Sequence, residues 1–418
     1  MPMGTFFPGS ATDHWSFESK TAELKHSLSQ TLTKYYPFAG RTSRIGQTFV
    51  DCNDTTLSDF LRRFDYKDLD QLCPDDLIWY KRNQRVKDDE NDMTSPIAGV
   101  QINHFTCGRV ALAVSLSHKV GDGDNLFNFV SDWATVTPSQ NKDASEMINP
   151  HFITNFQPRN IKVPKTLPNK EAGDDCVTRS FMFPNSKKND LKAMAMKAAE
   201  EFGKPPITIP TFAECLTWLI HKCAVAAATK TNSGTFEPTG LATIINIRSM
   251  TGGTIDIKIY KIGDYQSNFM EPLPDTTIGN VYQIMEFPTR NESEITTPNA
   301  IIGEIQKRKT EALRIRNIES MIGMIAETYS ETGMIERVKK IHTYYMCSFM
   351  NRFPAYAIDF GWGKPVKVSI SGTQKKFIIF MPSPNEEGIE ALVRLDRREM
   401  EIFQNDPMLL AFCSFLSD

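Results

Sequence analysis

The segment from Ser117 to Gly123 contains the residue types best suited to acid–base chemistry in this chain. His118 follows a run of alternating small and aliphatic residues, and Gly121 and Gly123 come closely after it. An imidazole accepts a proton near neutral pH and can return it, and glycine leaves room for a ligand to approach. The pattern indicates a general base at the end of a strand, where it would deprotonate a hydroxyl.

The same segment has a plainer interpretation. Asp122 is a favoured N-cap residue, and a surface turn that leads into a helix has the same composition. A calcium loop is excluded, because Asp122 and Asp124 lack the downstream glycine and glutamate that such a loop requires. The local pattern alone leaves the catalytic and the capping interpretations open.

A second segment, Asp359 to Pro365, combines an acid, two aromatic residues and two glycines. Taken alone, such a composition is typical of a turn with buried rings. Together with the histidine segment, however, it resembles the BAHD acyltransferases, whose signatures are His-x-x-x-Asp-Gly near the middle and Asp-Phe-Gly-Trp-Gly towards the C-terminus. The resemblance runs from about Ser19 to the end of the chain.

Shorter segments support this resemblance. They are Tyr35–Arg41, Val50–Asp54, Pro210–Phe212 with Trp218, and Asn246–Arg248. Within the family, the second signature and the neighbouring Gly388–Ala391 resemble the vinorine synthase-like group, which includes acetyltransferases of alkaloid pathways.

The resemblance implies a role for each matching residue. His118 is expected to be the catalytic base, and Asp122 and Gly123 to shape its loop. Asp359 is expected to pair with Arg248, since an arginine–carboxylate fork is directional and pins a loop well. The remaining residues are expected to line the channel for coenzyme A: Thr211, Trp362 and Gly363.

The resemblance also implies the reaction. It is the transfer of an acyl group, favoured as acetyl, from acyl-CoA to a hydroxyl of a plant specialised metabolite, with an alkaloid alcohol favoured. Acyl-CoA and a small-molecule alcohol are the expected partners, with no permanently bound cofactor, and the protein is expected to be a monomer. Two alternatives stay open: a catalytically silent relative that serves as an accessory protein, and an N-acyltransferase that uses an amine.

The length of 418 residues favours two domains. The resemblance implies an α/β fold of two chloramphenicol-acetyltransferase-like domains, each a mixed β-sheet flanked by helices, with a tunnel between them. The first domain is predicted at 1–158 with the histidine signature, and the second at 179–418 with the Asp-Phe-Gly-Trp-Gly signature. Residues 159–178 are the predicted linker, because proline and lysine are frequent there and apolar residues are rare.

Hydrophobic periodicity and breaker residues predict the elements that position these signatures. Helices are expected at 17–35, 188–202, 211–228, 299–313, 317–329 and from about 397. Strands are expected at 99–106 and 109–117, which form a hairpin, and at 241–247, 366–371, 376–381 and 389–395. Two departures from the family are expected: the chain begins so close to the first helix that the opening strand is absent, and residues 55–59 replace another strand.

Composition excludes several classes of function. A formal net charge of −3 provides no basic excess for nucleic acid. The eight cysteines form no C-x-x-C pair, so no metal site is expected, and their thiols are expected to be small buried hydrophobes. We see neither a signal peptide nor an apolar run that would span a bilayer. These features predict a cytoplasmic protein with no membrane partner.

Overall fold

The structure is a computed structural model that describes residues 2–8, 17–43, 49–52, 61–66, 94–105, 108–137, 147–152, 175–201, 208–248, 273–289, 291–312, 343–370 and 375–415. The chain forms two compact units. Unit 1 contains Met1–Thr154, Thr276–Asn280 and Phe353–Gly372, and unit 2 contains Asn155–Asp275, Val281–Arg352 and Thr373–Asp418.

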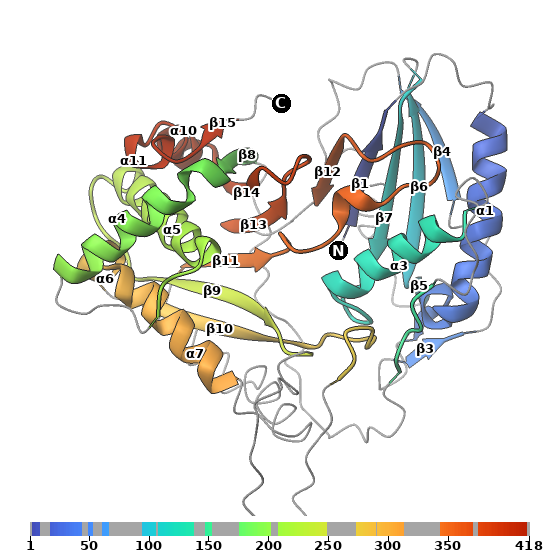
Figure 1. Cartoon of the computed structure of the whole chain (residues 1–418), viewed down its shortest axis with the longest axis horizontal. Coiled ribbons are helices and arrows are strands. Elements are labelled where there is room, and N and C mark those ends of the chain that lie inside the picture. The colour runs from blue at the N-terminus through green and yellow to red at the C-terminus, as the bar shows by residue number, and fades with distance from the viewer. Residues whose placement is uncertain are drawn as a thin grey trace, which may run out of the picture. The chain divides into compact units, whose positions relative to one another are not determined.

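Unit 1 is built on a five-stranded mixed sheet of order β12-β1-β7-β6-β4 (Figure 1). Neighbours are antiparallel except β4 and β6, which run parallel. Its strands are β1 (Pro2–Phe7), β4 (Leu61–Tyr66), β6 (Ala98–Phe105), β7 (Val110–Leu116) and β12 (Lys367–Ile370). A small sheet contains β3 (Phe49–Asp51), β2 (Arg41–Ser43) and β5 (Thr94–Pro96). The described helices of this unit are α1 (Phe17–Lys34), η1 (Tyr36–Ala39), α3 (Gly123–Thr135) and η8 (Ala355–Ala357).

The centre of unit 1 is strand β7, which lies between β1 and β6. All its residues are buried, both the valines and leucines on one face and the small residues on the other face. Helix α3, which follows the turn after β7, is tied to α1 by Trp133, whose Nε1 donates to the Leu24 carbonyl at 3.2 Å and to Ser27 Oγ at 3.0 Å. The turn that contains His118 is therefore held between two buried elements.

Unit 2 is built on a seven-stranded mixed sheet of order β10-β9-β11-β13-β14-β8-β15. Strand β11 runs parallel to both β9 and β13, and the other pairs are antiparallel. Its strands are β8 (Cys176–Pro184), β9 (Thr239–Asn246), β10 (Tyr282–Thr289), β11 (Thr343–Phe349), β13 (Phe377–Pro382), β14 (Gly388–Asp396) and β15 (Ser414–Phe415). Its described helices are η5 (Asn185–Lys187), α4 (Lys188–Glu201), α5 (Phe212–Thr231), α6 (Glu292–Thr296), η7 (Asn299–Gly303), α7 (Glu304–Ala312), α10 (Arg397–Phe403) and α11 (Pro407–Leu410).

The predicted fold class is confirmed, because each unit has a mixed sheet flanked by helices. The predicted hairpin is formed by β6 and β7, and α1, α4, α5 and α10 occur where helices were expected. The predicted helix at 317–329 and the altered segment at 55–59 lie outside the described residues.

One expected departure is wrong. The opening strand is present, because Pro2–Phe7 pairs with β7 on one side and with β12 on the other. Met3, Phe6 and Phe7 are buried there, and this apolar content gives so short a segment enough contact to form a strand ahead of α1.

The structure also divides the chain differently from the sequence-based boundaries. The Asp359–Gly363 segment belongs to unit 1 rather than to a C-terminal domain, because β12 just after it completes the sheet of unit 1. Residues 176–178, predicted as the end of the linker, form the start of β8, and residues 159–174 lie outside the described part.

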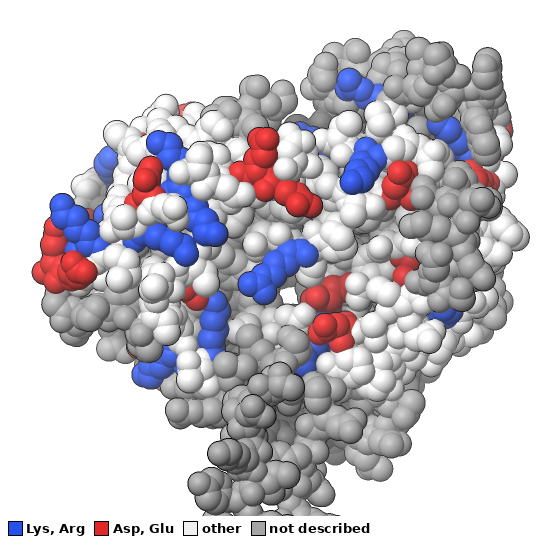
Figure 2. All heavy atoms as spheres, in the orientation of Figure 1, with Lys and Arg blue, Asp and Glu red and all other residues white. Residues whose placement is uncertain are grey.

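The described surface in Figure 2 carries Lys, Arg, Asp and Glu side chains of both signs, scattered among uncharged residues. On the described residues of this face we see no continuous band of one charge. None of the described helices is both long and apolar enough to cross a bilayer.

Phe360 is part of an aromatic cluster in unit 1 and is fully buried. Its ring packs edge-on against Trp133 with centroids 5.0 Å apart and against Phe7 at 5.8 Å. We predict that Phe360→Ala lowers the free energy of unfolding by roughly 3–5 kcal/mol, the usual cost of a cavity of this size. Unfolding of both proteins by denaturant measures this difference in free energy. Val366→Ala is the control, because Val366 is half exposed and its truncation should leave stability nearly unchanged.

His221 on α5 is fully buried, and neither ring nitrogen has a hydrogen-bond partner among the described residues. Burial, and then the charge of Lys376, lowers the pKa of His221 to about 3. Because the unfolded ring binds a proton below about pH 6.5, the free energy of unfolding should fall as pH drops from there towards 3, by up to about 1.4 kcal/mol per pH unit.

Replacing this histidine should remove that part of the pH dependence. His221→Phe should flatten the plot of unfolding free energy against pH between 7 and 5, whereas His26→Phe, at an exposed position on α1, should not. Parallel plots for the wild type and His221→Phe would contradict this prediction.

Candidate active site

His118 lies in the turn that joins β7 to α3. The turn begins at Ser117, whose N–H donates to the Ile97 carbonyl at 2.7 Å and whose carbonyl accepts the Val120 N–H at 3.0 Å. The His118 side chain is exposed on unit 1. The strand and the turn therefore hold the backbone of His118 rigidly while its ring is exposed, which suits contact with a substrate.

A residue far away in the sequence holds the ring. The Asn280 side chain spans His118: its Nδ2 donates to the His118 carbonyl at 2.6 Å, and its Oδ1 lies 3.0 Å from His118 Nδ1. A carbonyl only accepts, so the amide nitrogen of Asn280 must face it and the amide oxygen must face the ring. An amide oxygen also only accepts, so Nδ1 carries the proton.

This tautomer has a chemical consequence. With the proton on Nδ1, the lone pair of the neutral ring is on Nε2, which is the atom that can take a proton from a hydroxyl. The Asn280 contact therefore fixes both the orientation of the His118 ring and the nitrogen that can accept a proton.

Asp122 and Gly123 shape the start of α3. Asp122 is buried and is the N-cap: its Oδ1 accepts the Asn125 N–H at 3.3 Å, and Asn125 Oδ1 accepts the Asp122 N–H at 3.3 Å. Gly123 is the first residue of the helix. The capping interpretation of Asp122 thus describes its geometry, and it is compatible with a candidate base at His118, four residues earlier in the same turn.

The second signature forms its own turn in unit 1. Asp359 accepts the N–H groups of Gly361 at 2.7 Å and Gly363 at 3.1 Å, and both glycines have left-handed backbones with φ of 89° and 95°. Trp362 stacks on Phe360 with centroids 5.6 Å apart. Other residues would be strained at the two glycine positions, which accounts for the glycines of the signature.

Arg248 belongs to unit 2 and is fully buried. Its backbone N–H donates to Asn246 Oδ1 at 2.9 Å, and its guanidinium Nη1 lies 3.5 Å from the same oxygen. The expected pair with Asp359 joins residues of different units and stays a prediction.

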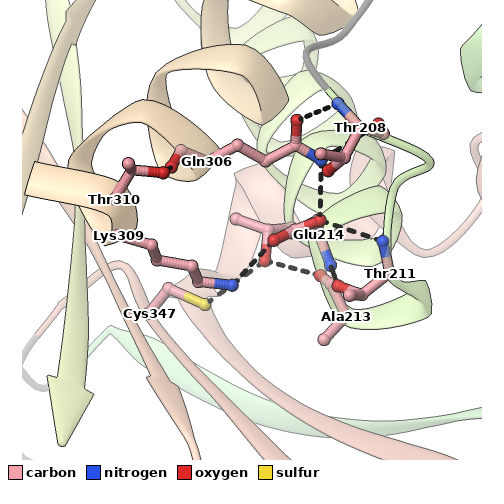
Figure 3. Close-up of polar contacts among 9 residues, drawn as sticks. Thr208, Thr211, Ala213, Glu214, Gln306, Lys309, Thr310 and Cys347 are labelled. Atoms are coloured by element: carbon pink, nitrogen blue, oxygen red, sulfur yellow. Dashed lines mark hydrogen bonds and ion pairs between the residues drawn. The ribbon is translucent and has the colours of Figure 1, made fainter. Parts of the chain in front are cut away.

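Thr211 lies at the N-terminus of α5 in unit 2, within a polar network (Figure 3). Its hydroxyl accepts the Glu214 N–H at 3.2 Å, and Glu214 Oε2 accepts the Thr211 N–H at 2.9 Å, a reciprocal capping box. From α7, Lys309 donates to Glu214 Oε1 at 2.7 Å and Gln306 bonds both the N–H and the carbonyl of Thr208.

The charge of Glu214 is stabilised in this network. Burial by itself raises the pKa of Glu214, but the hydrogen bond from Lys309, the Thr211 N–H and the charge of Lys309 outweigh it, so that the pKa is lowered. The network fixes the loop 208–211 against α7, and thereby fixes Thr211.

Comparison with known proteins identifies the family. Residues 4–410 match the sequence profile of the Transferase family. The chain is 30% identical to akuammiline synthase 1 of Alstonia scholaris, over 94% of this chain and 86% of that protein. It is also 30% identical to the 17,18-epoxy-17-hydroxycur-19-ene N-malonyltransferase of Strychnos nux-vomica, over 94% of this chain and 79% of that protein. The chain belongs to the BAHD acyltransferases.

Solved structures share the fold of this BAHD acyltransferase. The structure of vinorine synthase has a TM-score of 0.66 at 21% identity and covers 98% of this chain and 89% of that one. The complex of F. sporotrichioides TRI101 with coenzyme A and T-2 has a TM-score of 0.70 at 13% identity, covering 100% and 95%. The family and the fold were both predicted from the two signatures, and both are confirmed.

The structure brings some of the predicted site residues of this acyltransferase together. His118, Asp122 and Gly123 share one turn of unit 1, and the Asp359 turn belongs to the same unit, whereas Arg248 and Thr211 belong to unit 2. Sequence reasoning missed Asn280, because it lies 162 residues from His118 and no short pattern marks it. Among the described residues, no group of His, Cys, Asp or Glu side chains is arranged to hold a metal ion.

The contact between His118 and Asn280 makes a testable prediction. Asn280→Ala should lower kcat of the acyl transfer by roughly tenfold or more, because the His118 ring, the candidate base, loses one hydrogen bond and its fixed tautomer. The KM for acyl-CoA should change little. Steady-state kinetics with acyl-CoA measures both constants.

Asn291→Ala is the matched control. Asn291 is an exposed N-cap of α6, where its side chain accepts the Glu294 N–H. That variant should keep the kcat of the wild type, and an equal loss in both variants would contradict a specific role for Asn280.

Proposed function

We propose that this chain transfers an acyl group, favoured as acetyl, from coenzyme A to a hydroxyl of a plant specialised metabolite, with an alkaloid alcohol favoured and His118 as the general base. The observation that carries the proposal is the Asn280 contact, which leaves the lone pair on His118 Nε2. Relatives named for O-acetyl transfer support the choice of reaction: the deacetylvindoline and the minovincinine 19-hydroxy O-acetyltransferases of Catharanthus roseus, each 28% identical over 94% of this chain.

The proposed reaction is direct. Nε2 of His118 takes the hydroxyl proton as the acceptor oxygen attacks the thioester carbon. The tetrahedral intermediate then collapses, the carbon–sulfur bond breaks, and the imidazolium returns the proton to the sulfur of coenzyme A. Proton transfer of this kind contributes on the order of 10²–10⁴ in rate. Holding both substrates in one complex contributes the remainder through proximity.

The state of the buried cysteines supports a transfer without an acyl-enzyme. Burial raises the pKa of Cys215 to about 12 and that of Cys347 to about 12. Because only a thiolate is a good nucleophile, these thiols stay unreactive at neutral pH. His118 is therefore a better candidate than either cysteine for the reacting group.

Acyl-CoA is the second substrate in this proposal. Three residues would line its path: Thr211 at the N-terminus of α5, and Trp362 and Gly363 in the signature turn. The TRI101 complex contains coenzyme A in a protein of this fold, which supports that choice of donor. We further propose that the enzyme acts as a cytoplasmic monomer.

A second candidate is N-acyl transfer with an amine acceptor. The similarity to an N-malonyltransferase of Strychnos nux-vomica favours it, and also favours malonyl-CoA as a donor. The base chemistry would be the same, because an amine also loses a proton when it is acylated. A silent accessory protein is disfavoured, since the tautomer of His118 is held in the form that a base requires.

The test is a thiol-release assay with acetyl-CoA and malonyl-CoA against alkaloid alcohols and amines. His118→Ala should lower turnover by at least about 10²-fold. It should leave thermal stabilisation by coenzyme A unchanged, because the base is not needed for that binding. Mass spectrometry of the product separates an ester from an amide.

His26→Ala is the matched control, because His26 lies exposed on α1, where its Nε2 is 3.3 Å from Gln30 Nε2. It should turn over like the wild type. Retained turnover in His118→Ala would end the proposed mechanism.

A further inference from the structure

Segment 276–280 of unit 1 supplies Asn280 to His118, so whatever fixes this segment also affects the ring. One of its attachments is to His151. The His151 N–H donates to the Thr276 carbonyl at 3.1 Å, the Ile278 N–H donates to the His151 carbonyl at 2.9 Å, and His151 Nδ1 lies 3.1 Å from Thr277 Oγ1. These bonds hold the beginning of the segment.

The second attachment comes from α3. Asn125 is fully buried in the first turn of this helix. Its Oδ1 accepts the Gly279 N–H at 2.9 Å, and its Nδ2 donates to the Thr277 carbonyl at 2.9 Å. One amide therefore bonds two backbone groups of the segment, and one of them, the Gly279 N–H, belongs to the residue directly before Asn280.

The same side chain is bonded to the histidine turn. Asn125 Oδ1 also accepts the Asp122 N–H, at 3.3 Å, and the Asn125 N–H donates to the Asp122 carboxylate. An amide oxygen has two lone pairs, and here one serves the turn and the other the segment. Asn125 thus bonds both the turn that contains His118 and the segment that contains Asn280. The distance between these two pieces of chain sets the distance from Asn280 to His118.

The packing around Asn125 matches this arrangement. A Cβ added to Gly121 would lie 3.0 Å from Asn125 Oδ1 and 3.1 Å from its Cβ. Contacts that short force a neighbour to move. The glycine of the turn therefore leaves the space that the Asn125 side chain fills.

From these contacts we infer that Asn125 is a positioning residue of the acyl transfer, acting through residues 277–280 on the orientation and tautomer of His118. The inference rests on the proposed function, in which His118 is the base. Asparagine suits the task because it accepts and donates at once: serine or alanine would leave the Gly279 N–H or the Thr277 carbonyl without this buried partner.

The first test is kinetic. Asn125→Ala should lower kcat roughly tenfold, the equivalent of one hydrogen bond, while KM for acyl-CoA changes little. The remaining bonds to His151 keep the segment attached, so the variant should fold. Ser27→Ala is the matched control: Ser27 is a fully buried polar residue of unit 1 that bonds Trp133 and Thr137, and its loss should cost stability without changing kcat.

A double-mutant cycle tests whether the effect passes through Asn280. In the Asn280→Ala background, Asn125→Ala should change kcat by less than about twofold, because the contact it supports is already gone. Effects of the two substitutions that multiply instead would overturn the inference.

A spectroscopic measurement separates positioning from loss of structure. Imidazole nitrogen shifts of histidine-labelled full-length protein, with the His118 signal assigned from His118→Ala, should report a protonated Nδ1 in the wild type and a mixture of tautomers in Asn125→Ala. An unchanged signal would overturn the inference. This result needs no turnover, so it is decided separately from the proposed function, which fails if His118→Ala stays active.

Discussion

The position of the His118 ring depends on hydrogen bonds between the turn after β7 and residues 276–280. A turn at the end of a buried strand has backbone N–H and carbonyl groups that no strand partner satisfies. Asn280 satisfies one of them, the His118 carbonyl, and uses the other end of its amide on the ring. One side chain therefore both satisfies a backbone carbonyl of the turn and fixes the tautomer of the candidate base.

In unit 2, too, one side chain satisfies several hydrogen-bonding groups, next to the predicted channel residue Thr211. In unit 2 the carboxylate of Glu214 caps α5 and at the same time accepts from Lys309 and Gln306 on α7 (Figure 3). Because every oxygen of this carboxylate is bonded, its buried charge costs little, and loop and helix are held in one arrangement. Thr211, the predicted channel residue, is held in place by the same hydrogen bonds.

The two units are also interlaced along the chain. Unit 1 takes residues 276–280 and 353–372 from the sequence that otherwise builds unit 2. The first insertion brings Asn280 to His118, and the second brings the Asp359 turn and β12 to the sheet of unit 1. The two signatures, which lie far apart in the sequence, thus both belong to unit 1. A boundary drawn at one linker would assign them to different domains.

Local patterns were enough to predict the helices and strands around the signatures, because periodicity and breaker residues act over a few neighbours. The family and its fold were predicted from the resemblance of the two signatures to those of the BAHD acyltransferases. The histidine and its aspartate could also be named from the sequence, since both lie in one turn. Asn280, Asn125 and the membership of Asp359 in unit 1 could not, nor could the strand at Pro2–Phe7. Those features depend on pairing between segments more than a hundred residues apart, and a side chain's partner at that distance is chosen by the packing of whole sheets, which no short stretch of sequence encodes.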